Sequence, residues 1–190
     1  MTQQITDFKI GRQDKFFIDS NVWLYLYYPT VSGASKRVSD QYSELLNEIL
    51  EKGNLIFTNL IQFSELINVI HHQEYYDAVY RKKFQGKFKN FRESEKFSEA
   101  MNTAKLVTNQ ITKQTHLQTG MFTSDEMKTM VGSCDKADFN DIYFIELAKK
   151  ENLHIITHDF DFKAASNCKP ILWSLVDACT RAITSLFISK

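Results

Sequence analysis

Acidic residues recur in this chain at places where a short apolar run ends or a helical pattern begins. Asp19 directly follows one apolar run, and Asp159 and Asp161 follow another. Glu65 and Asp141 lie in segments of helical spacing that start close to such positions. Carboxylates that converge repel one another, and a bound divalent cation relieves that repulsion. Mg²⁺ and Mn²⁺ prefer oxygen ligands, so these residue types predict a site for one of those ions.

A cation held by carboxylates supports hydrolysis of a phosphodiester bond. It lowers the pKa of a bound water and neutralises charge in the transition state, so no covalent enzyme intermediate is needed. Each acidic residue alone is more often a helix cap or a solvated surface group, because the chain has 23 of them and Asp favours caps and turns. The hypothesis depends on four acidic positions that recur at matching places, namely Asp19, Glu65, Asp141 and Asp159.

The apolar pattern predicts strands and helices in alternation. Strands are expected at 15–19, 55–59, 153–157 and 169–175. Helices are expected at 20–28, 37–52, 60–73, 74–93, 94–117 and 138–152, with a looser stretch at 118–135 and a helix or tail at 176–188. Short buried strands that alternate with amphipathic helices predict an α/β fold with a central parallel sheet covered on both faces. Ligands bind at the carboxyl ends of such strands, where we expect the acidic residues to meet.

Composition sets the broad class of protein. The 190 residues, 43% of them apolar, suit one domain with a full core. The three cysteines are odd in number and lack metal-ligand spacing, which favours a reducing, cytoplasmic setting. The sequence has neither a membrane-spanning apolar run nor a signal-peptide pattern at its start. The formal net charge of zero gives no general support for nucleic-acid binding, but it permits a local basic patch.

Residues 81–96 form such a patch, with seven Lys or Arg against two Glu. Phe84, Phe88 and Phe91 recur there at helical spacing, which predicts that they pack against a core or a partner. Basic side chains neutralise RNA phosphates, although a solvated face is the alternative interpretation. The candidate RNA-binding residues are Arg81, Lys82, Lys83, Lys87, Lys89 and Arg92.

The acidic motifs together resemble those of the PIN domain family. This family of metal-dependent ribonucleases includes the VapC toxins of toxin–antitoxin pairs. "FIDSNVWLY" is similar to the family's first-strand signature, and "TNLIQFSELINVI" is similar to its second motif. "DFNDIYFIELAKKENLHIITHDFDF" resembles the third and fourth motifs together. The similarity covers about residues 15–73 and 136–175, with all four motifs in the family's order.

The resemblance implies roles for individual residues around a Mg²⁺ or Mn²⁺ ion. The catalytic and metal-binding residues are Asp19, Glu65, Asp141 and Asp159. The supporting residues, which act through hydrogen bonds, are Asn21, Thr157 and Asp161. Asp138 lies one helical turn before Asp141 and stays open as an alternative ligand.

The resemblance also implies an architecture and a function for the whole chain. The expected fold is a three-layer α/β/α PIN-like domain over residues 1–190, with a parallel sheet of four to five strands. A helical insertion at about 74–135 is long for the family, which favours a PIN nuclease of another context over a toxin. The implied activity is metal-dependent RNA endonuclease activity. The implied partners are the RNA substrate, a cognate antitoxin and a second copy in a homodimer, with no membrane.

Three alternatives fit the sequence less well. A PIN-like scaffold that binds RNA or protein without cutting should have lost carboxylates, and this chain keeps all four. A phosphatase with a strand-end Asp nucleophile needs a second Asp two residues on, where this chain has Asn21. A zinc site would need ligands of suitable spacing, which His71, His72 and His158 do not provide. His158 is more often a turn residue, although it is placed to orient Asp159 or a phosphate.

Overall fold

The computed structural model describes residues 2–4, 8–29, 35–135, 137–159, 162 and 171–173. For 2–4 and 171–173 it describes the backbone only. The chain divides into two compact units, the first formed by residues 1–56 and 120–190 and the second by residues 57–119. Within the described ranges, no helix is long and apolar enough to cross a membrane.

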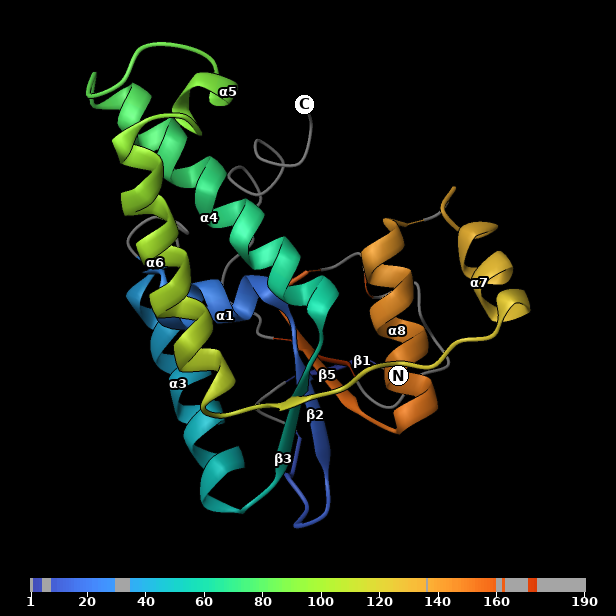
Figure 1. Cartoon of the computed structure of the whole chain (residues 1–190). Helices are drawn as coiled ribbons and strands as arrows, with labels where there is room; N and C mark the ends of the chain where they lie inside the picture. The colour runs from blue at the N-terminus through green and yellow to red at the C-terminus, as the bar shows by residue number, and fades with distance from the viewer. Residues whose placement is uncertain are drawn as a thin grey trace. The chain divides into compact units, whose positions relative to one another are not determined.

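The first unit contains a parallel sheet (Figure 1). Its strands are β1 (Thr2–Gln4), β2 (Lys15–Ile18), β5 (His154–Thr157), β6 (Ile171–Trp173) and the start of β3 (Leu55–Thr58). They follow the order β1-β6-β5-β2-β3, and the pairs β1–β6, β6–β5 and β5–β2 are parallel. Three of the four residues of β2 and all four of β5 are buried. Burial on both faces explains why these strands read as continuous apolar runs.

The helices of the first unit begin at polar caps. They are α1 (Ser20–Tyr27), α3 (Lys36–Glu51), α7 (Ser124–Val131) and α8 (Phe139–Glu151). Their N-cap side chains, from Asp19, Ser35, Thr123 and Asp138, each accept a backbone N–H of the first turn. These bonds satisfy N–H groups that have no partner within the helix, so the caps fix where each helix starts.

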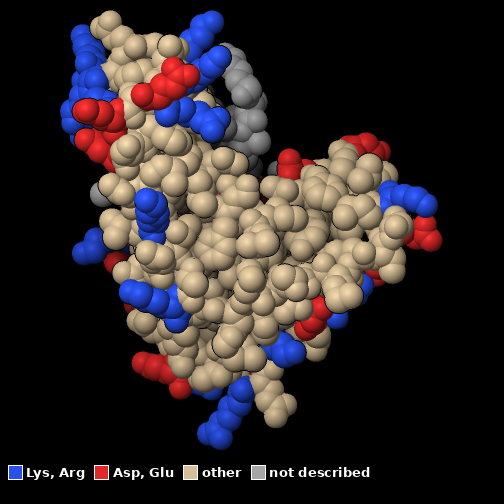
Figure 2. All heavy atoms as spheres, in the orientation of Figure 1, with Lys and Arg blue, Asp and Glu red and all other residues tan. Residues whose placement is uncertain are grey.

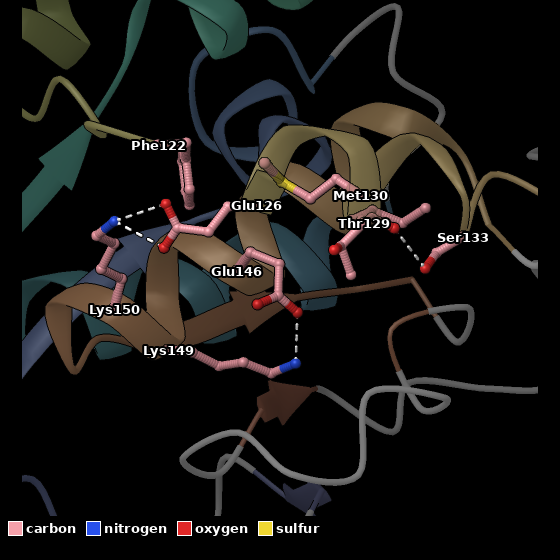
Figure 3. Close-up of a pocket in the computed structure, with 9 residues that line it drawn as sticks. Phe122, Glu126, Thr129, Met130, Ser133, Glu146, Lys149 and Lys150 are labelled. Atoms are coloured by element: carbon pink, nitrogen blue, oxygen red, sulfur yellow. Dashed lines mark hydrogen bonds and ion pairs between the residues drawn. The ribbon is translucent and has the colours of Figure 1, made fainter. Parts of the chain in front are cut away.

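The helices α7 and α8 are joined by a charge pair beside a cavity (Figure 3). Thr123 and Glu126 form a capping box at the start of α7. The Glu126 carboxylate also lies 3.0 Å from Lys150 Nζ, which donates to the Met121 carbonyl at 2.6 Å. The cavity of about 420 Å³ is lined by residues such as Met130, and none of the acidic candidates lines it. The pair therefore braces α8, the helix that carries Asp141.

The second unit is a helical hairpin with a two-strand edge. It contains α4 (Leu60–Tyr80), α5 (Phe88–Phe91), α6 (Glu95–Thr112), the end of β3 and β4 (His116–Leu117). The helices α4 and α6 pack along each other, and β4 pairs in parallel with β3 (Figure 1). An aromatic cluster fills the end of the hairpin next to α5. It comprises the buried Phe91 with Tyr75, Phe84, Phe88 and Phe97, packed on Ala78 and Ala100.

The predicted α/β class with a parallel sheet is confirmed, since each strand pair with a described register is parallel. The expected strands correspond to β2, β3, β5 and β6, and the predicted packing of the three phenylalanines against a core is also confirmed. The strands β1 and β4 were missed because they span three and two residues without an apolar run. The predicted single domain with an insertion stays a prediction. The helix or tail expected at 176–188 lies outside the described residues.

Two predictions between the second and third motifs were wrong, one of a helix and one of a looser stretch. A helix over 74–93 is interrupted at 81–87, because α4 ends at Tyr80 and α5 covers only Phe88–Phe91. Lys82 and Gly86 have positive φ angles of 55° and 136°, and the Ala78 carbonyl accepts the N–H groups of Lys83 and Phe84. The looser stretch at 118–135 contains α7, whose apolar residues are too few to give a strong pattern.

Replacing Phe91 by Ala tests whether the aromatic cluster stabilises the second unit. Phe91 is 1% exposed and its ring lies 5.4–6.2 Å from the rings of Tyr75, Phe84, Phe88 and Phe97. We expect a loss of about 3–5 kcal/mol in the free energy of unfolding, from lost burial and the cavity left behind. Urea unfolding followed by circular dichroism measures it. The control is Leu106→Ala on α6, a residue that is 68% exposed, and it should change the free energy of unfolding by less than about 0.5 kcal/mol. Equal effects of the two substitutions would contradict a stabilising role of the aromatic cluster.

The brace between α7 and α8 predicts a pH-dependent contribution to stability. The Thr123 backbone N–H, and then Lys150, lower the pKa of Glu126 from 4.5 to about 2. A folded-state pKa below the unfolded value means that the carboxylate stabilises the fold above about pH 4.5, and that this contribution is lost as the pH falls toward 2. The stability difference between the wild type and Glu126→Gln should therefore shrink over that window in urea unfolding. An exposed control, Glu44→Gln, should show no such change.

Candidate active site

The site is built at the carboxyl ends of two adjacent parallel strands. Ile18 of β2 is in register with Ile156 of β5, so the next residues, Asp19 and Thr157, lie side by side. The Asp19 N–H donates to the Ile156 carbonyl at 2.9 Å, which extends the ladder by one bond. Strand pairing alone therefore brings together two residues that are 138 positions apart in the sequence.

The Asp19 carboxylate is fixed from two sides. Its Oδ1 accepts the Ser20 N–H at 2.6 Å, and its Oδ2 accepts the Thr157 hydroxyl at 2.7 Å. Asp19 is only 6% exposed and caps α1. Hydrogen bonds to a carboxylate, together with the positive end of the helix dipole, favour its charged form. The side chain thus presents an oriented negative charge at the edge of the sheet.

Thr157 links the Asp19 carboxylate to the backbone of Asp159. Its hydroxyl donates to Asp19 and accepts the N–H of Asp159 at 2.9 Å. Thr157 is fully buried, while Asp159 is partly buried, just past the end of β5. A single hydroxyl therefore holds the Asp19 carboxylate and the backbone that carries Asp159.

The pKa of Tyr25 on α1 is affected by both carboxylates. Burial, and then the charges of Asp19 and Asp159, raise the pKa of Tyr25 to about 12. Both charges act on the same phenol because both carboxylates lie close to it. Asp19 and Asp159 therefore both lie within electrostatic range of Tyr25.

Two further side chains hold the turn after β5. The Tyr42 hydroxyl lies 3.0 Å from His158 Nδ1 and 3.3 Å from the Thr157 carbonyl oxygen. Asn21 Oδ1 accepts the His158 N–H at 3.4 Å, so this supporting residue contacts the turn that precedes Asp159. Burial lowers the pKa of His158, and the charge of Asp159 opposes that shift. These contacts orient the backbone at the fourth carboxylate.

Tyr25 and Tyr42 were not predicted as site residues. Tyr42 lies on the buried face of α3, where it is fully enclosed. The Tyr25 ring lies 5.1 Å from the His158 ring and 6.2 Å from the Tyr42 ring. In the sequence, both residues are tyrosines within an otherwise apolar helical pattern. A buried Tyr hydroxyl usually has a polar partner, so this pattern indicates a polar group nearby.

Asp138 and Asp141 take different places on α8. Asp138 is the N-cap, and its carboxylate accepts the Asn140 N–H at 2.8 Å in an exposed position. Asp141 lies in the first turn and is partly buried. The capping bond gives Asp138 a structural role. A cap alone does not decide between them, since Asp19 also caps a helix, but Asp138 is exposed and Asp141 is partly buried, which favours Asp141.

The remaining candidates are distributed over the chain. Glu65 lies on α4 of the second unit, partly buried between the buried Gln62 and Leu66. Asp161 lies outside the described residues. The basic candidates are exposed and belong to the second unit, and they are Arg81, Lys82, Lys83, Lys87, Lys89 and Arg92.

The donor chemistry at the strand ends suits a hard cation. Asp19 and Asp159 offer carboxylate oxygens, and Mg²⁺ commonly binds to one or two carboxylates while it keeps several waters. Among the described residues, no group of three His, Cys, Asp or Glu side chains forms a ready-made cage for a metal ion. The two adjacent histidines of α4 make aromatic contacts, His71 with Phe97 and His72 with Phe88. These oxygen donors would suit a divalent cation that keeps several of its waters.

Replacing Thr157 by Val tests the hydroxyl bridge. The variant keeps the side-chain shape but removes the donor to Asp19 and the acceptor for the Asp159 N–H. We expect a loss of about 1.5–3 kcal/mol in unfolding free energy, as for a hydrogen bond to a charged group. Thr157→Ser keeps the hydroxyl and should lose less in the same urea titration. A Val variant as stable as the wild type would show that the bridge contributes nothing.

Comparisons with solved structures identify related folds. A chain in the crystal structure of VapBC2 from Rickettsia felis, bound to a DNA fragment from their promoter, superposes with a TM-score of 0.51. It is 16% identical, and the superposition covers 84% of this chain and 99% of that one. PAE2754 from Pyrobaculum aerophilum has a TM-score of 0.46 at 12% identity, with coverage of 90% and 91%. At these identities the likeness to the Rickettsia chain concerns the fold alone. No curated protein matches the chain significantly.

A family comparison goes further than these structures. The model of the PIN domain matches residues 16–167, a range that contains all four acidic candidates. PIN domains are generally nucleases, and they typically use divalent metal ions. Because the match spans most of the sequence and includes both strand ends of the site, this chain is a member of the PIN domain family.

Proposed function

We propose that this protein is a Mg²⁺- or Mn²⁺-dependent endoribonuclease. The observation that carries the proposal is the pair of carboxylates at adjacent strand ends. Asp19 and Asp159 are joined through the Thr157 hydroxyl and act together on Tyr25. Two converging carboxylates in a family of nucleases are best explained by a shared cation.

The proposed roles are those that the family's motifs imply for the residues at these positions. Asp19, Asp141 and Asp159 hold the cation, and Glu65 holds it or positions the attacking water. When bound, the cation lowers the pKa of that water and neutralises negative charge on the phosphate. Thr157 and Asn21 keep the carboxylates in place through the hydrogen bonds described above. Water adds across one phosphodiester bond, so one product gains a hydroxyl and the other a proton.

The setting of this activity is proposed from the family and from the fold. The likeness in fold to a chain of VapBC2 supports a toxin with a cognate antitoxin as one setting. In that setting, a homodimer and an antitoxin partner would accompany the RNA substrate. A nuclease outside a toxin–antitoxin pair is the other setting, favoured by the long segment between the second and third motifs.

Cleavage of a pool of end-labelled RNAs tests the proposed activity. We expect the purified protein to cut RNA with Mg²⁺ or Mn²⁺ and to stop when EDTA removes the metal. Asp19→Asn should lower the rate by at least about 100-fold, since losing even an outer-shell partner costs 10–100-fold. Asn also caps helices well, so the variant should fold. No cutting of RNA or DNA with either metal would favour a binding scaffold instead.

A second set of variants separates the ligands from the helix cap. Asp141→Asn, Asp159→Asn and Glu65→Gln should each lose activity as Asp19→Asn does. Asp138→Asn is the matched control, because it changes a neighbouring carboxylate and leaves a good N-cap. It should keep most of the activity. The reverse result for Asp138 and Asp141 would make Asp138 the ligand.

A further inference from the structure

The second unit carries a concentrated positive charge at one end. Residues 81–92, here called the cationic tip, connect the end of α4 to α5 and include α5. They contain six basic residues and no acidic residue, in a chain whose formal net charge is zero. Figure 2 shows Lys and Arg side chains gathered over this end of the second unit, with some Asp and Glu side chains of neighbouring segments beside them. The positive charge is therefore a local feature that the whole-chain charge conceals.

Most of these cations have no acidic partner. Arg81 pairs with Asp77 at 2.7 Å. In the part of the chain that the structure describes, no ion pair involves the other five basic residues of the tip, and all of them are exposed. Like charges held this close repel one another, so the arrangement disfavours the isolated protein and favours a bound polyanion.

The tip is held in place from inside. Phe84, Phe88 and Phe91 point into the aromatic cluster, and the Tyr75 hydroxyl donates to the Gly86 carbonyl at 2.9 Å. The cations consequently project from an ordered surface and not from a loose tail. Ordering in advance reduces the entropy lost when a ligand binds.

The chemistry of the tip fits a phosphate backbone. Its phenylalanine rings pack in the cluster, so stacking on bases would depend on Tyr80, which is 87% exposed and precedes the tip. Lysine and arginine contacts to phosphate position a nucleic acid without reading its sequence. A membrane surface is disfavoured, because the tip itself exposes no large apolar residue among those described.

We propose that the cationic tip is an RNA-binding surface that grips the phosphate backbone independently of sequence. Its use in holding a substrate rests on the proposed nuclease function. Glu65 and Tyr80 are both on α4, fifteen residues apart, which corresponds to about 22 Å at 1.5 Å per residue. An RNA that reaches from Glu65 to the tip must span that length.

Fluorescence anisotropy tests the surface with a labelled RNA of about 20 nucleotides. The RNA is titrated in EDTA, which prevents cleavage, at salt concentrations from about 50 to about 200 mM. The variant carries Lys82→Gln, Lys83→Gln and Lys87→Gln. We expect binding to weaken at least about 10-fold at low salt, and the slope of log affinity against log salt to fall by about 2, or 0.7 for each lost phosphate contact. Circular dichroism checks that the variant folds.

A matched control removes the same charge elsewhere. Lys9→Gln, Lys105→Gln and Lys113→Gln change three exposed lysines outside the tip. This variant should bind RNA within about 3-fold of the wild type and keep its salt slope. Equal losses in the two variants would show general electrostatic attraction and overturn the proposal. Competition by polyglutamate as effective as that by unlabelled RNA would also overturn it.

Cleavage assays separate this proposal from the proposed function. With RNAs long enough to span the tip, the tip variant should raise KM and leave kcat unchanged, because its lysines do not touch the reacting atoms. RNAs of about three nucleotides are too short to reach from Glu65 to the tip, so KM for them should not change. Tip-dependent binding without any cleavage would retain the surface and reject the nuclease. If the protein cleaves RNA and the tip variant binds RNA as well as the wild type does, the nuclease is retained and the RNA-binding surface is rejected.

Discussion

The site depends on a hydrogen bond between the ends of two parallel strands. The Thr157 hydroxyl donates to the buried Asp19 carboxylate, and the same oxygen accepts the N–H of Asp159. A buried carboxylate is costly unless it is hydrogen-bonded, and here Ser20 and Thr157 both supply donors. The register of β2 and β5 places these partners next to each other, so the sheet itself assembles the chemistry.

Capping and catalysis use the same residue types in this fold. Asp19 caps α1 and also faces the carboxylate environment around Tyr25, whereas Asp138 caps α8 from an exposed position. What separates the two is their surroundings. Asp19 is enclosed by α1, β5 and the turn held by Tyr42 and His158, while the Asp138 side chain bonds only locally in the described structure. Burial and a second carboxylate make the difference between a helix start and a candidate metal ligand.

The second unit separates its basic side chains from its aromatic side chains. Its hairpin end carries alternating basic and aromatic residues, and the fold directs the two kinds in opposite directions. The aromatic rings form a core around Phe91, which offsets the repulsion among the cations that remain outside. Among the described residues, only Arg81 of this exposed positive surface forms an ion pair, so packing inside the cluster holds the other cations in place. That property follows from packing and would not be inferred from net charge.

The sequence by itself determined the α/β class, the main strands and the acidic positions. Apolar runs such as 16–18 are local signals, because burial on both faces of a sheet demands continuous apolar residues. Strand-end positions for Asp19 and Asp159 follow directly from them. The break at 81–87 was missed because the periodicity of Phe84, Phe88 and Phe91 imitates a helix, although their rings meet through a turn and a short helix.

Only the tertiary structure decided which side chains support the carboxylates. Tyr25 and Tyr42 lie on helices whose patterns indicate a core, and they join the site because α1 and α3 bring their rings to His158. The contact between Asp19 and Thr157 spans 138 positions and exists because β2 and β5 are neighbours in the sheet. Local sequence determines where a strand ends. Which other strand end lies beside it depends on the pairing of distant segments, which no local pattern encodes.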